Sequence, residues 1–521
     1  MNLDEFLYNL HYETDKASPS DWIVNWEDSP LPYKLYQGLP VIPLSADVPL
    51  NLDQSKIFSN PSLQEIGYYL WYTFGLTQIS QTLHIAEPRE TPPLFRRFVP
   101  SGGALYPNEL YIYLKIEDLS KGIYHYDVAH HRLVLLREGN FDSYLSQALG
   151  NRCDFSSSFA TVFISTFFWK NFFKYHNFSY RLQGLDAGFL IGQLLRVGKQ
   201  FGFETGVYYH FLDRAVNHLL GLSEQEESVY AVIPLSVDSE IKWFSNKNSE
   251  VPPSATRLCK ELEKLEHQHY VRSKEIREYP MLVKMNEACM IRSFPYLQQI
   301  KKEKDKESRI PSILLPRVNG VSNDLAVASR KRYSPGWDFV LKQVSQNELS
   351  TLLMEATSAF TYRNDIDEGF TEQPFRVSLY GCFYNVKGIP NGSFYYDSST
   401  HALIPIQMGD FRNRLQFGLS AEFVNMSQIP FSFNVVGHKD HYQNAFGYRG
   451  HRIQQMEAGI LSQHLLLTAS ALNMGGHPLL GFSVNSYDNL YKISAKEKTS
   501  LLHIPIGHFR SNPRLEGSLH N

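Results

Sequence analysis

The chain has 521 residues, more than one ordinary domain core accommodates, so two or more domains are predicted. Hydrophobic residues account for 43% and charged residues for 20%, as in an ordinary soluble globular protein. The formal net charge of −3 provides no basic surface for nucleic acid, and the absence of about 18 consecutive apolar residues argues against a membrane span.

The cysteines and the N-terminus indicate the compartment. Cys153, Cys259, Cys289 and Cys382 are scattered without a CxxC pair, so neither a disulfide framework nor zinc-ligand spacing is present. The histidines also lack the spacing of a zinc-binding helix. The N-terminal sequence MNLDEFLYNLHYETD is acidic and has no apolar signal-peptide core. We therefore predict a cytoplasmic protein without a metal site.

The first half of the chain contains an arm and one domain. Residues 1–55 are rich in proline, tryptophan and tyrosine, and we predict an extended N-terminal arm because proline fixes φ and removes a hydrogen-bond donor. Residues 56–240 form the first predicted domain. Its elements are a helix from Ser62, a strand at 109–116, a strand pair within 122–136, a strand at 159–166, a long helix at 182–202 and a strand at 229–235.

The second half repeats this order. Residues 241–315 are charged, as in KELEKLEHQHYVRSKEIREY, and are predicted to be a connector with helical segments. Residues 316–521 form the second predicted domain, in which LDAGFLIGQLL (185–195) has the counterpart MEAGILSQHLL (456–466). Five elements recurring in the same order predict a tandem domain repeat. They are a helix at 346–360, a strand at 375–386, a strand pair within 392–406, a long helix at 452–476 and a strand at 501–510.

A glycine loop is the sharpest local feature of the first domain. Ser101, Gly102 and Gly103 lie in PSGGALYP, directly before the strand ELYIYL. Glycine has no Cβ, so the backbone N–H groups of such a loop can approach a flat or anionic ligand closely. An ordinary tight turn is the alternative interpretation of these residues.

The residues around this loop carry a family resemblance. PSGGALYPNELYIYL, GIYHYD, LLREGN, KYHNFSYRLQGLDAGFLIGQLL and the arm sequence WEDSPLPYKLYQGLP together resemble the SagB-type dehydrogenases, a branch of the FMN-dependent nitroreductase superfamily. The resemblance covers most of residues 1–235 and, more weakly, 309–515. It implies an α+β fold of tandem nitroreductase-like domains forming an intramolecular pseudo-dimer, with mainly antiparallel sheets and long central helices.

The resemblance also implies one FMN site shared by the two halves. In the superfamily, an Arg-x-Ser of one subunit holds the phosphate and a Pro-Ser loop of the other contacts the flavin ring. The second half has Arg332 and Ser334 where the first has 54–58 (QSKIF), and it has 372–375 (EQPF) in place of the glycine loop. A solvated surface charge is the alternative interpretation of Arg332. The implied cofactor-binding residues are Ser101, Gly102, Gly103, Arg332, Ser334, Gly475, Gly476 and Arg510.

Lys174 and Tyr175 are the implied catalytic residues. They begin KYHNFSYR, which resembles the Lys-Tyr motif of the azoline oxidases but lacks its Gly and first Arg, and the second half has Ala445-Phe446 there. Making an azoline aromatic requires loss of a carbon-bound proton and of a hydride, and a base with its pKa moved towards neutrality could take the proton. An exposed lysine and a core tyrosine are the alternative interpretation.

The function implied by the resemblance is FMN-dependent oxidation of thiazoline or oxazoline rings in a ribosomally made precursor peptide. A cyclodehydratase that makes the azoline is the implied partner, and a homodimer is compatible with the sequence. Two alternatives stay open. One is a generic NAD(P)H-dependent FMN reductase of nitro or quinone compounds, and the other is a flavin-free degenerate scaffold that binds a peptide or a partner enzyme.

Overall fold

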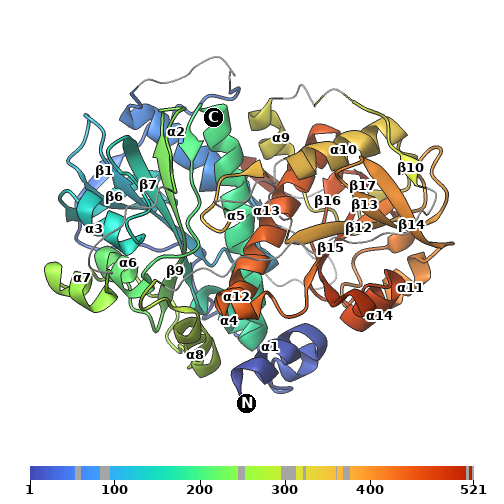
Figure 1. Cartoon of the computed structure of the whole chain (residues 1–521), viewed down its shortest axis with the longest axis horizontal. Helices are drawn as coiled ribbons and strands as arrows, with labels where there is room; N and C mark the ends of the chain where they lie inside the picture. The colour runs from blue at the N-terminus through green and yellow to red at the C-terminus, as the bar shows by residue number, and fades with distance from the viewer. Residues whose placement is uncertain are drawn as a thin grey trace.

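Two α/β units lie side by side in the computed structural model of the chain (Figure 1). The structure describes residues 1–52, 60–81, 94–244, 253–294, 312–318, 320, 324–358, 361–367, 376–511 and 515–518. Each unit is built on one antiparallel sheet, and a long helix from each lies in the centre of the molecule.

The first unit contains a seven-stranded sheet in the order β1-β6-β5-β4-β7-β9-β8. Strands β4 and β7 pair in register from Asn108 opposite Thr166 to Leu114 opposite Ala160, which places them at the buried centre of the sheet. The strands are β1 (Val41–Pro43), β4 (Asn108–Leu114), β5 (Gly122–Asp127), β6 (Arg132–Glu138), β7 (Ser158–Phe167), β8 (Glu204–Thr205) and β9 (Glu227–Ser236). The helices of this half are α2 (Leu63–Phe74), α3 (Asp142–Ala148), α4 (Trp169–Tyr175), α5 (Ser179–Gln200) and α6 (Asp213–Leu220).

The second unit has the corresponding order β10-β14-β13-β12-β15-β17, with β16 and β11 also paired to β17. The strands are β10 (Ile313–Leu314), β11 (Phe339–Val340), β12 (Val377–Phe383), β13 (Gly392–Asp397), β14 (Ala402–Met408), β15 (Phe431–His438), β16 (Gly475–Gly476) and β17 (Lys498–Phe509). The helices are α9 (Leu325–Lys331), α10 (Gln346–Ser358), α11 (Arg412–Gly418), α12 (Gln443–Phe446), α13 (Arg449–Ala471) and α14 (Val484–Leu490). The predicted recurrence of elements is therefore confirmed in strand order and in helix position.

The central helices α5 and α13 approach each other closely, and glycine permits it. A Cβ at Gly188 would lie 2.1 Å from the carbonyl oxygen of Met456, and a Cβ at Gly459 would lie 2.4 Å from that of Leu185. Any larger residue would therefore push the helices apart. The repeated Asp-Ala-Gly and Glu-Ala-Gly sequences owe their shared glycine to this reciprocal contact.

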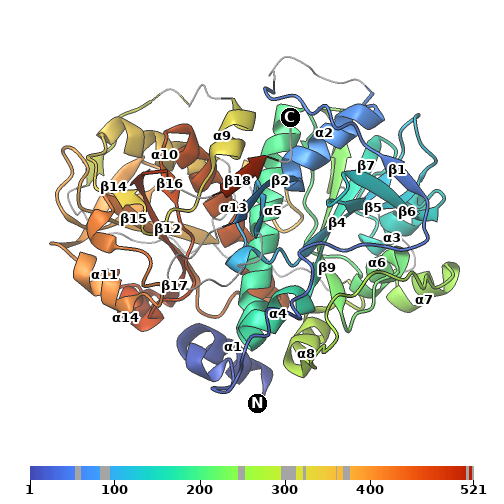
Figure 2. The ribbon, with the colours of Figure 1, turned by 180° about the vertical axis from the view of Figure 1, so that it is seen from behind.

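The two units also exchange their terminal segments. Strand β18 (Leu515–Ser518), at the C-terminal end, pairs with β2 (Leu76–Gln81), which in turn pairs with β3 (Leu94–Arg97) (Figure 2). Near the N-terminus, Nε2 of His11 lies 2.7 Å from Oγ1 of Thr499 in the second unit. Each end of the chain thus contacts the half farthest from it in sequence.

Two sequence predictions are wrong in detail. The N-terminal arm is not wholly extended, because α1 (Leu3–Tyr12) is a helix with an Asn2–Glu5 capping box and a buried face that includes Phe6 and Leu10. In the connector, the helices are α7 (Ala255–Glu261) and α8 (Pro280–Cys289), whereas most of the charged segment between them is not helical. There the backbone of His269 instead bridges to Tyr36 of the arm.

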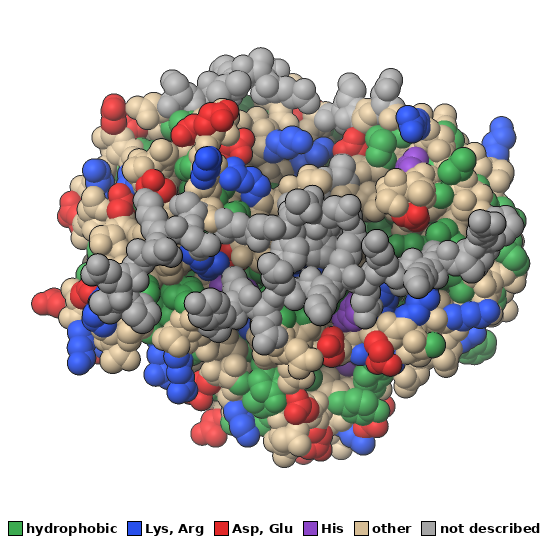
Figure 3. Space-filling model, viewed as in Figure 1, with side chains coloured by type: hydrophobic (Ala, Val, Ile, Leu, Met, Phe, Trp, Pro, Cys, Tyr) green, Lys and Arg blue, Asp and Glu red, His purple; other side chains and the backbone are tan. Residues whose placement is uncertain are grey.

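Charged side chains of both signs are interspersed over the described part of the face in Figure 3, without a large area of one sign. In the part of the chain that the structure describes, no helix combines the length and the apolar character needed to cross a bilayer.

Candidate active site

The glycine loop forms a short turn directly under Lys174 and Tyr175. Gly103 has φ +66°, in the left-handed region that favours glycine. A Cβ at this position would come within 2.8 Å of both Nζ of Lys174 and Oη of Tyr175. The structure therefore brings the predicted loop and the predicted catalytic pair together, and Gly103 remains exposed on the solvent side.

Lys174 and Tyr175 lie at the end of α4, where both side chains are partly buried. Nζ of Lys174 is 4.9 Å from the ring centroid of Tyr175 and 5.2 Å from that of Trp26 in the N-terminal arm. Burial lowers the pKa of Lys174 and, together with the nearby Asp186 carboxylate, raises the pKa of Tyr175. Both shifts favour a neutral amine and a protonated phenol.

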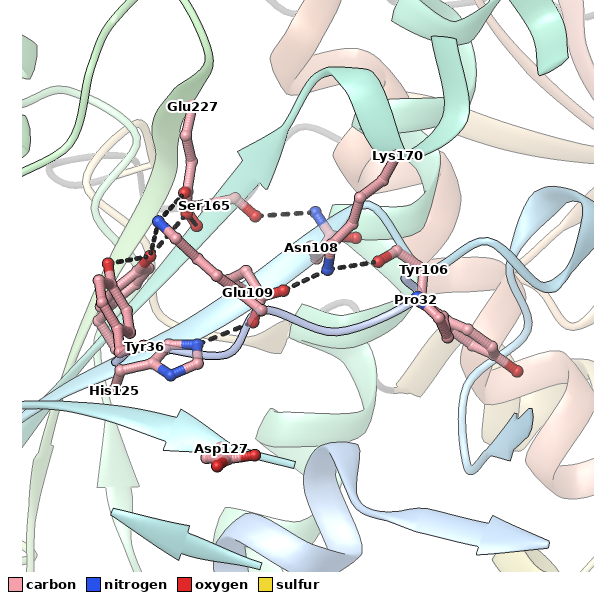
Figure 4. Close-up of polar contacts among 12 residues, drawn as sticks. Pro32, Tyr36, Tyr106, Asn108, Glu109, His125, Asp127, Ser165, Lys170 and Glu227 are labelled. Carbon is pink, nitrogen blue, oxygen red and sulfur yellow. Dashed lines mark hydrogen bonds and ion pairs between the residues drawn. The ribbon is translucent and has the colours of Figure 1, made fainter. Parts of the chain in front are cut away.

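A buried ion network anchors the other end of α4 (Figure 4). Lys170, one helical turn before Lys174, pairs with Glu109 of β4 and donates to the carbonyl oxygen of Tyr106 at 3.3 Å. Nε2 of His125 contacts the second carboxylate oxygen of Glu109 at 2.9 Å. Burial alone would raise the pKa of Glu109, but Lys170 and His125 hold it below its usual range. The network fixes α4 to the strand that follows the glycine loop.

Asp186 is a site residue that the sequence analysis missed. It lies on α5 with a 4% exposed side chain, and Oγ of Ser101 donates to its carboxylate at 2.5 Å. Burial raises the pKa of Asp186 to about 7. Its signal in the sequence is a lone acid within the apolar run LQGLDAGFLIGQLL, which is unusual because buried carboxylates are normally paired.

Arg332 reaches from the second unit to the strand that leads into the glycine loop. Its Nε donates to the carbonyl oxygen of Phe98 at 2.7 Å, and its Nη1 lies 3.4 Å from Oγ of Ser334. The side chain is 4% exposed, and no carboxylate in the described ranges forms an ion pair with it. Burial, followed by repulsion from Arg96, lowers the pKa of Arg332 to about 9. A buried guanidinium without a counter-ion is suited to bind an anion.

Gly475 and Gly476 lie against the segment that follows Arg332. They form β16, and a Cβ at Gly475 would lie 2.5 Å from Cγ of Pro335. His477, the next residue, places Nδ1 2.7 Å from the carbonyl oxygen of Pro335. The glycine pair therefore packs beside the predicted phosphate-binding segment.

Arg510 is less closely tied to the site. Its backbone N–H donates to the carbonyl oxygen of Asp338 at 3.0 Å, which places the backbone near this segment, but its side chain is exposed. No side-chain contact of Arg510 with the other site residues is present among the described residues.

The counterpart positions in the second unit have a different chemistry. Glu457, which corresponds to Asp186, accepts from Nε of Arg376 at 2.8 and 2.9 Å, and Arg376 also pairs with Asp367. Ala445 and Phe446 of α12 replace the lysine and tyrosine. The segments 54–58 and 372–375, named in the sequence analysis, lie outside the described residues.

The residues around the glycine loop and Arg332 fit an FMN molecule. The buried Arg332, which forms no ion pair with a described carboxylate, suits a phosphate together with Ser334, and the loop at Gly103 leaves a backbone surface that a flat ring can approach. No group of three or more metal-ligating side chains occurs in the described part of the chain.

Comparison with a known structure decides the fold. A candidate nitroreductase from Anabaena variabilis matches 98% of this chain and 99% of its own, with a TM-score of 0.73 and 20% sequence identity. This chain has a nitroreductase-like fold. No protein-family model matches the sequence.

Two further proteins are similar to part of this chain. The trifolitoxin-processing protein TfxB of Rhizobium leguminosarum bv. trifolii is 30% identical over 139 residues, which are 26% of this chain and 37% of TfxB. The match thus spans just over a third of that relative. A chain of the E. coli microcin synthetase McbBCD complex is 19% identical over 39% of this chain and 70% of its own, at a TM-score of 0.28, which is too low to support an inference.

Proposed function

We propose that the chain is an FMN-dependent oxidoreductase that converts azoline rings of a ribosomally made precursor peptide into azoles. One observation carries the proposal: the glycine loop contacts Lys174 and Tyr175 on one side, while the strand leading into it contacts Arg332 of the second unit. The two units would then act as an intramolecular pseudo-dimer with one complete flavin site.

The roles of the residues follow from their environment. When bound, FMN would accept the two electrons of the substrate as a hydride. Lys174, whose pKa is lowered by burial, would take the carbon-bound proton of the ring on Nζ. Tyr175 keeps its proton and would orient the ring as a hydrogen-bond donor. The ring would lose one proton and one hydride, and molecular oxygen would take up the two electrons when it regenerates the oxidised cofactor, so protons and electrons balance over each turnover.

The cofactor would be held from both units. Arg332 and Ser334 would bind the phosphate, the backbone from Ser101 to Gly103 would face the flavin ring, and Gly475 and Gly476 would flank it. In the second unit, the carboxylate of Glu457 forms an ion pair with Arg376, and the counterpart position has no Lys-Tyr pair. Both observations support one working site rather than two.

The proposed partners are an azoline-containing peptide and the cyclodehydratase that makes its rings. Support for this substrate class comes from the similarity to a protein named for trifolitoxin processing. The proposal places the enzyme in the cytoplasm and is compatible with a homodimer.

The test is turnover of an azoline peptide by the purified, FMN-reconstituted protein. We expect the peptide to lose two hydrogens per ring in mass spectrometry, without added NAD(P)H. Rapid NAD(P)H oxidation with a nitro or quinone acceptor and an unchanged peptide would instead support a generic FMN reductase, which the match to a candidate nitroreductase favours. A protein that binds no FMN would be the degenerate scaffold.

A further inference from the structure

Asp186 makes two contacts with the glycine loop, and no cation among the described residues forms an ion pair with it. Its carboxylate accepts from Oγ of Ser101 at 2.5 Å and from the backbone N–H of Gly102. The same Ser101 oxygen accepts the backbone N–H of Tyr106 at 2.9 Å. One carboxylate on the rigid central helix thus fixes the loop at its start and, through Ser101, at its end.

Burying a carboxylate without a cation lowers the stability of the fold, so this carboxylate points to a role other than stability. The carboxylate is almost fully buried, and no Lys or Arg in the described part of the chain forms an ion pair with it. Its counterpart Glu457, at the same position of α13, is neutralised by Arg376. Unpaired buried charges of this kind are concentrated at functional sites.

We propose that Asp186 is the positioning residue of the glycine loop, holding Ser101 and Gly102 so that Gly103 faces the flavin ring beneath Lys174 and Tyr175. The inference rests on the proposed flavin site and adds a pH response to it. Burial raises the pKa of Asp186 to about 7, so the buried carboxyl that holds the loop binds a proton more tightly than a carboxyl released to solvent. The held loop is therefore most stable below that pH, and it loosens as the pH rises and the carboxyl ionises.

Few other titratable groups face Asp186. From α4, Tyr175 senses the carboxylate and Lys174 lies over Gly103 on the far side of the loop. From α13, Arg452, Gln455 and Met456 lie against this stretch of α5, and the guanidinium of Arg452 is paired with Asp213. The raised pKa of Tyr175 keeps it neutral across the range of interest, so Asp186 dominates the response near pH 7.

The test compares Asp186→Asn with a matched control, Asp488→Asn. Asp488 is also buried, with a 1% exposed side chain, and accepts a hydroxyl from Thr499 at 2.8 Å and the backbone N–H of Ser500 at 2.7 Å. It belongs to the second unit and does not touch the glycine loop. The dissociation constant for FMN would be measured by flavin fluorescence between about pH 6 and pH 8.

The wild-type protein and Asp488→Asn are expected to lose about tenfold in FMN affinity from the lower to the upper pH, equal to one pKa unit of coupling. Asp186→Asn replaces one acceptor oxygen with an amide N–H2 group, so it is expected to bind about tenfold more weakly at the lower pH and to show no pH dependence. An Asp186→Asn profile that follows the wild type would overturn the inference.

Hydrogen exchange in protein without FMN separates this inference from the proposed function. Asp186→Asn should speed exchange at the amides of Gly102 and Tyr106, whereas Asp488→Asn should do so at Ser500. If the wild type binds no FMN but this pattern appears, the proposed function fails and the positioning role stands. If FMN binds and the loop amides exchange equally in Asp186→Asn and the wild type, the positioning role fails.

Discussion

Nε of Arg332 donates to the carbonyl oxygen of Phe98 at 2.7 Å, joining residues 234 positions apart in the two units. Phe98 directly precedes the loop that carries Ser101, so the contact ties the predicted phosphate-binding arginine to the predicted ring-binding loop. We expect FMN binding to depend on this contact, and turnover to depend on Lys174 and Tyr175 beside Gly103.

Replacing Arg332 with methionine should weaken FMN binding by at least tenfold, because charge-assisted hydrogen bonds to phosphate contribute about 1.5–3 kcal/mol. The FMN-free protein should also lose stability, by about 1–3 kcal/mol, because the change leaves the buried carbonyl oxygen of Phe98 without its donor. Arg330→Met is the control, since Arg330 is two residues away and its Nη1 donates to Oη of the buried Tyr72 at 3.1 Å. Equal FMN affinities for the two variants would contradict the assignment.

Gly103→Ala should abolish turnover with a modest loss of stability. The new Cβ would lie 2.8 Å from Nζ of Lys174 and Oη of Tyr175, and the left-handed backbone adds about 1–3 kcal/mol of strain. Gly38→Ala is the control, because Gly38 has φ +71° with no atom within 4 Å of its Cβ position. Both variants should show similar denaturation midpoints, and only Gly103→Ala should lose azole formation. Normal turnover in that variant would remove the close contact from the proposal.

Lys174→Ala with Tyr175→Phe should reduce azole formation by about 10²–10⁴-fold while FMN stays bound. The acting form of Lys174 is the neutral amine, so the wild-type rate should rise with pH through the lowered pKa of this lysine and then level off. The rising limb should be missing in Lys174→Ala. The pH–rate profile and the flavin spectrum check these outcomes, and an unchanged profile would exclude Lys174 as the base.

Lys170→Met should lower the free energy of unfolding by about 3–5 kcal/mol at neutral pH, because it leaves the buried Glu109 without its cation. Glu109 has a depressed pKa, so its favourable contribution is present above the unfolded-state pKa and is lost as the pH falls. The difference from wild type should therefore shrink in acid, as measured by chemical denaturation at about pH 7 and pH 4.

Lys34→Met is the companion variant for Lys170→Met. Lys34 forms a comparable buried pair with Glu227 at 2.8 Å but does not belong to α4. Both variants should lose stability, whereas only Lys170→Met should also lower the turnover number, because it frees the helix that carries Lys174. Equal turnover in the two variants would show that the network has no positioning effect.

Local sequence patterns predicted the regular elements well. The capping box from Ser62 to Glu65 marks the start of α2, and alternating or continuous apolar runs mark β4, β7 and β9. These signals are short-range, so a single sequence displays them. The same approach missed α1, because the proline-rich remainder of the arm dominated the composition of that segment.

Residue types also predicted part of the candidate site. The glycine loop stands out in the sequence itself, whereas the Lys-Tyr pair and Arg332 were named only through the family resemblance. The sequence does not show whether these residues contact one another. The contacts of Gly103 with Lys174 and of Arg332 with Phe98 arise from the packing of α4 and α9 against the first unit.

The sequence by itself determined the order of elements and the repeat, and its family resemblance named the residues proposed to bind a flavin. Only the tertiary structure decided that Asp186 accepts a hydrogen bond from Ser101. It also decided that Glu457, the counterpart of Asp186 in the repeat, pairs with Arg376. The physical reason is that secondary structure follows from periodic local patterns, whereas the charge state of a buried carboxylate depends on a few distant side chains that no periodicity records.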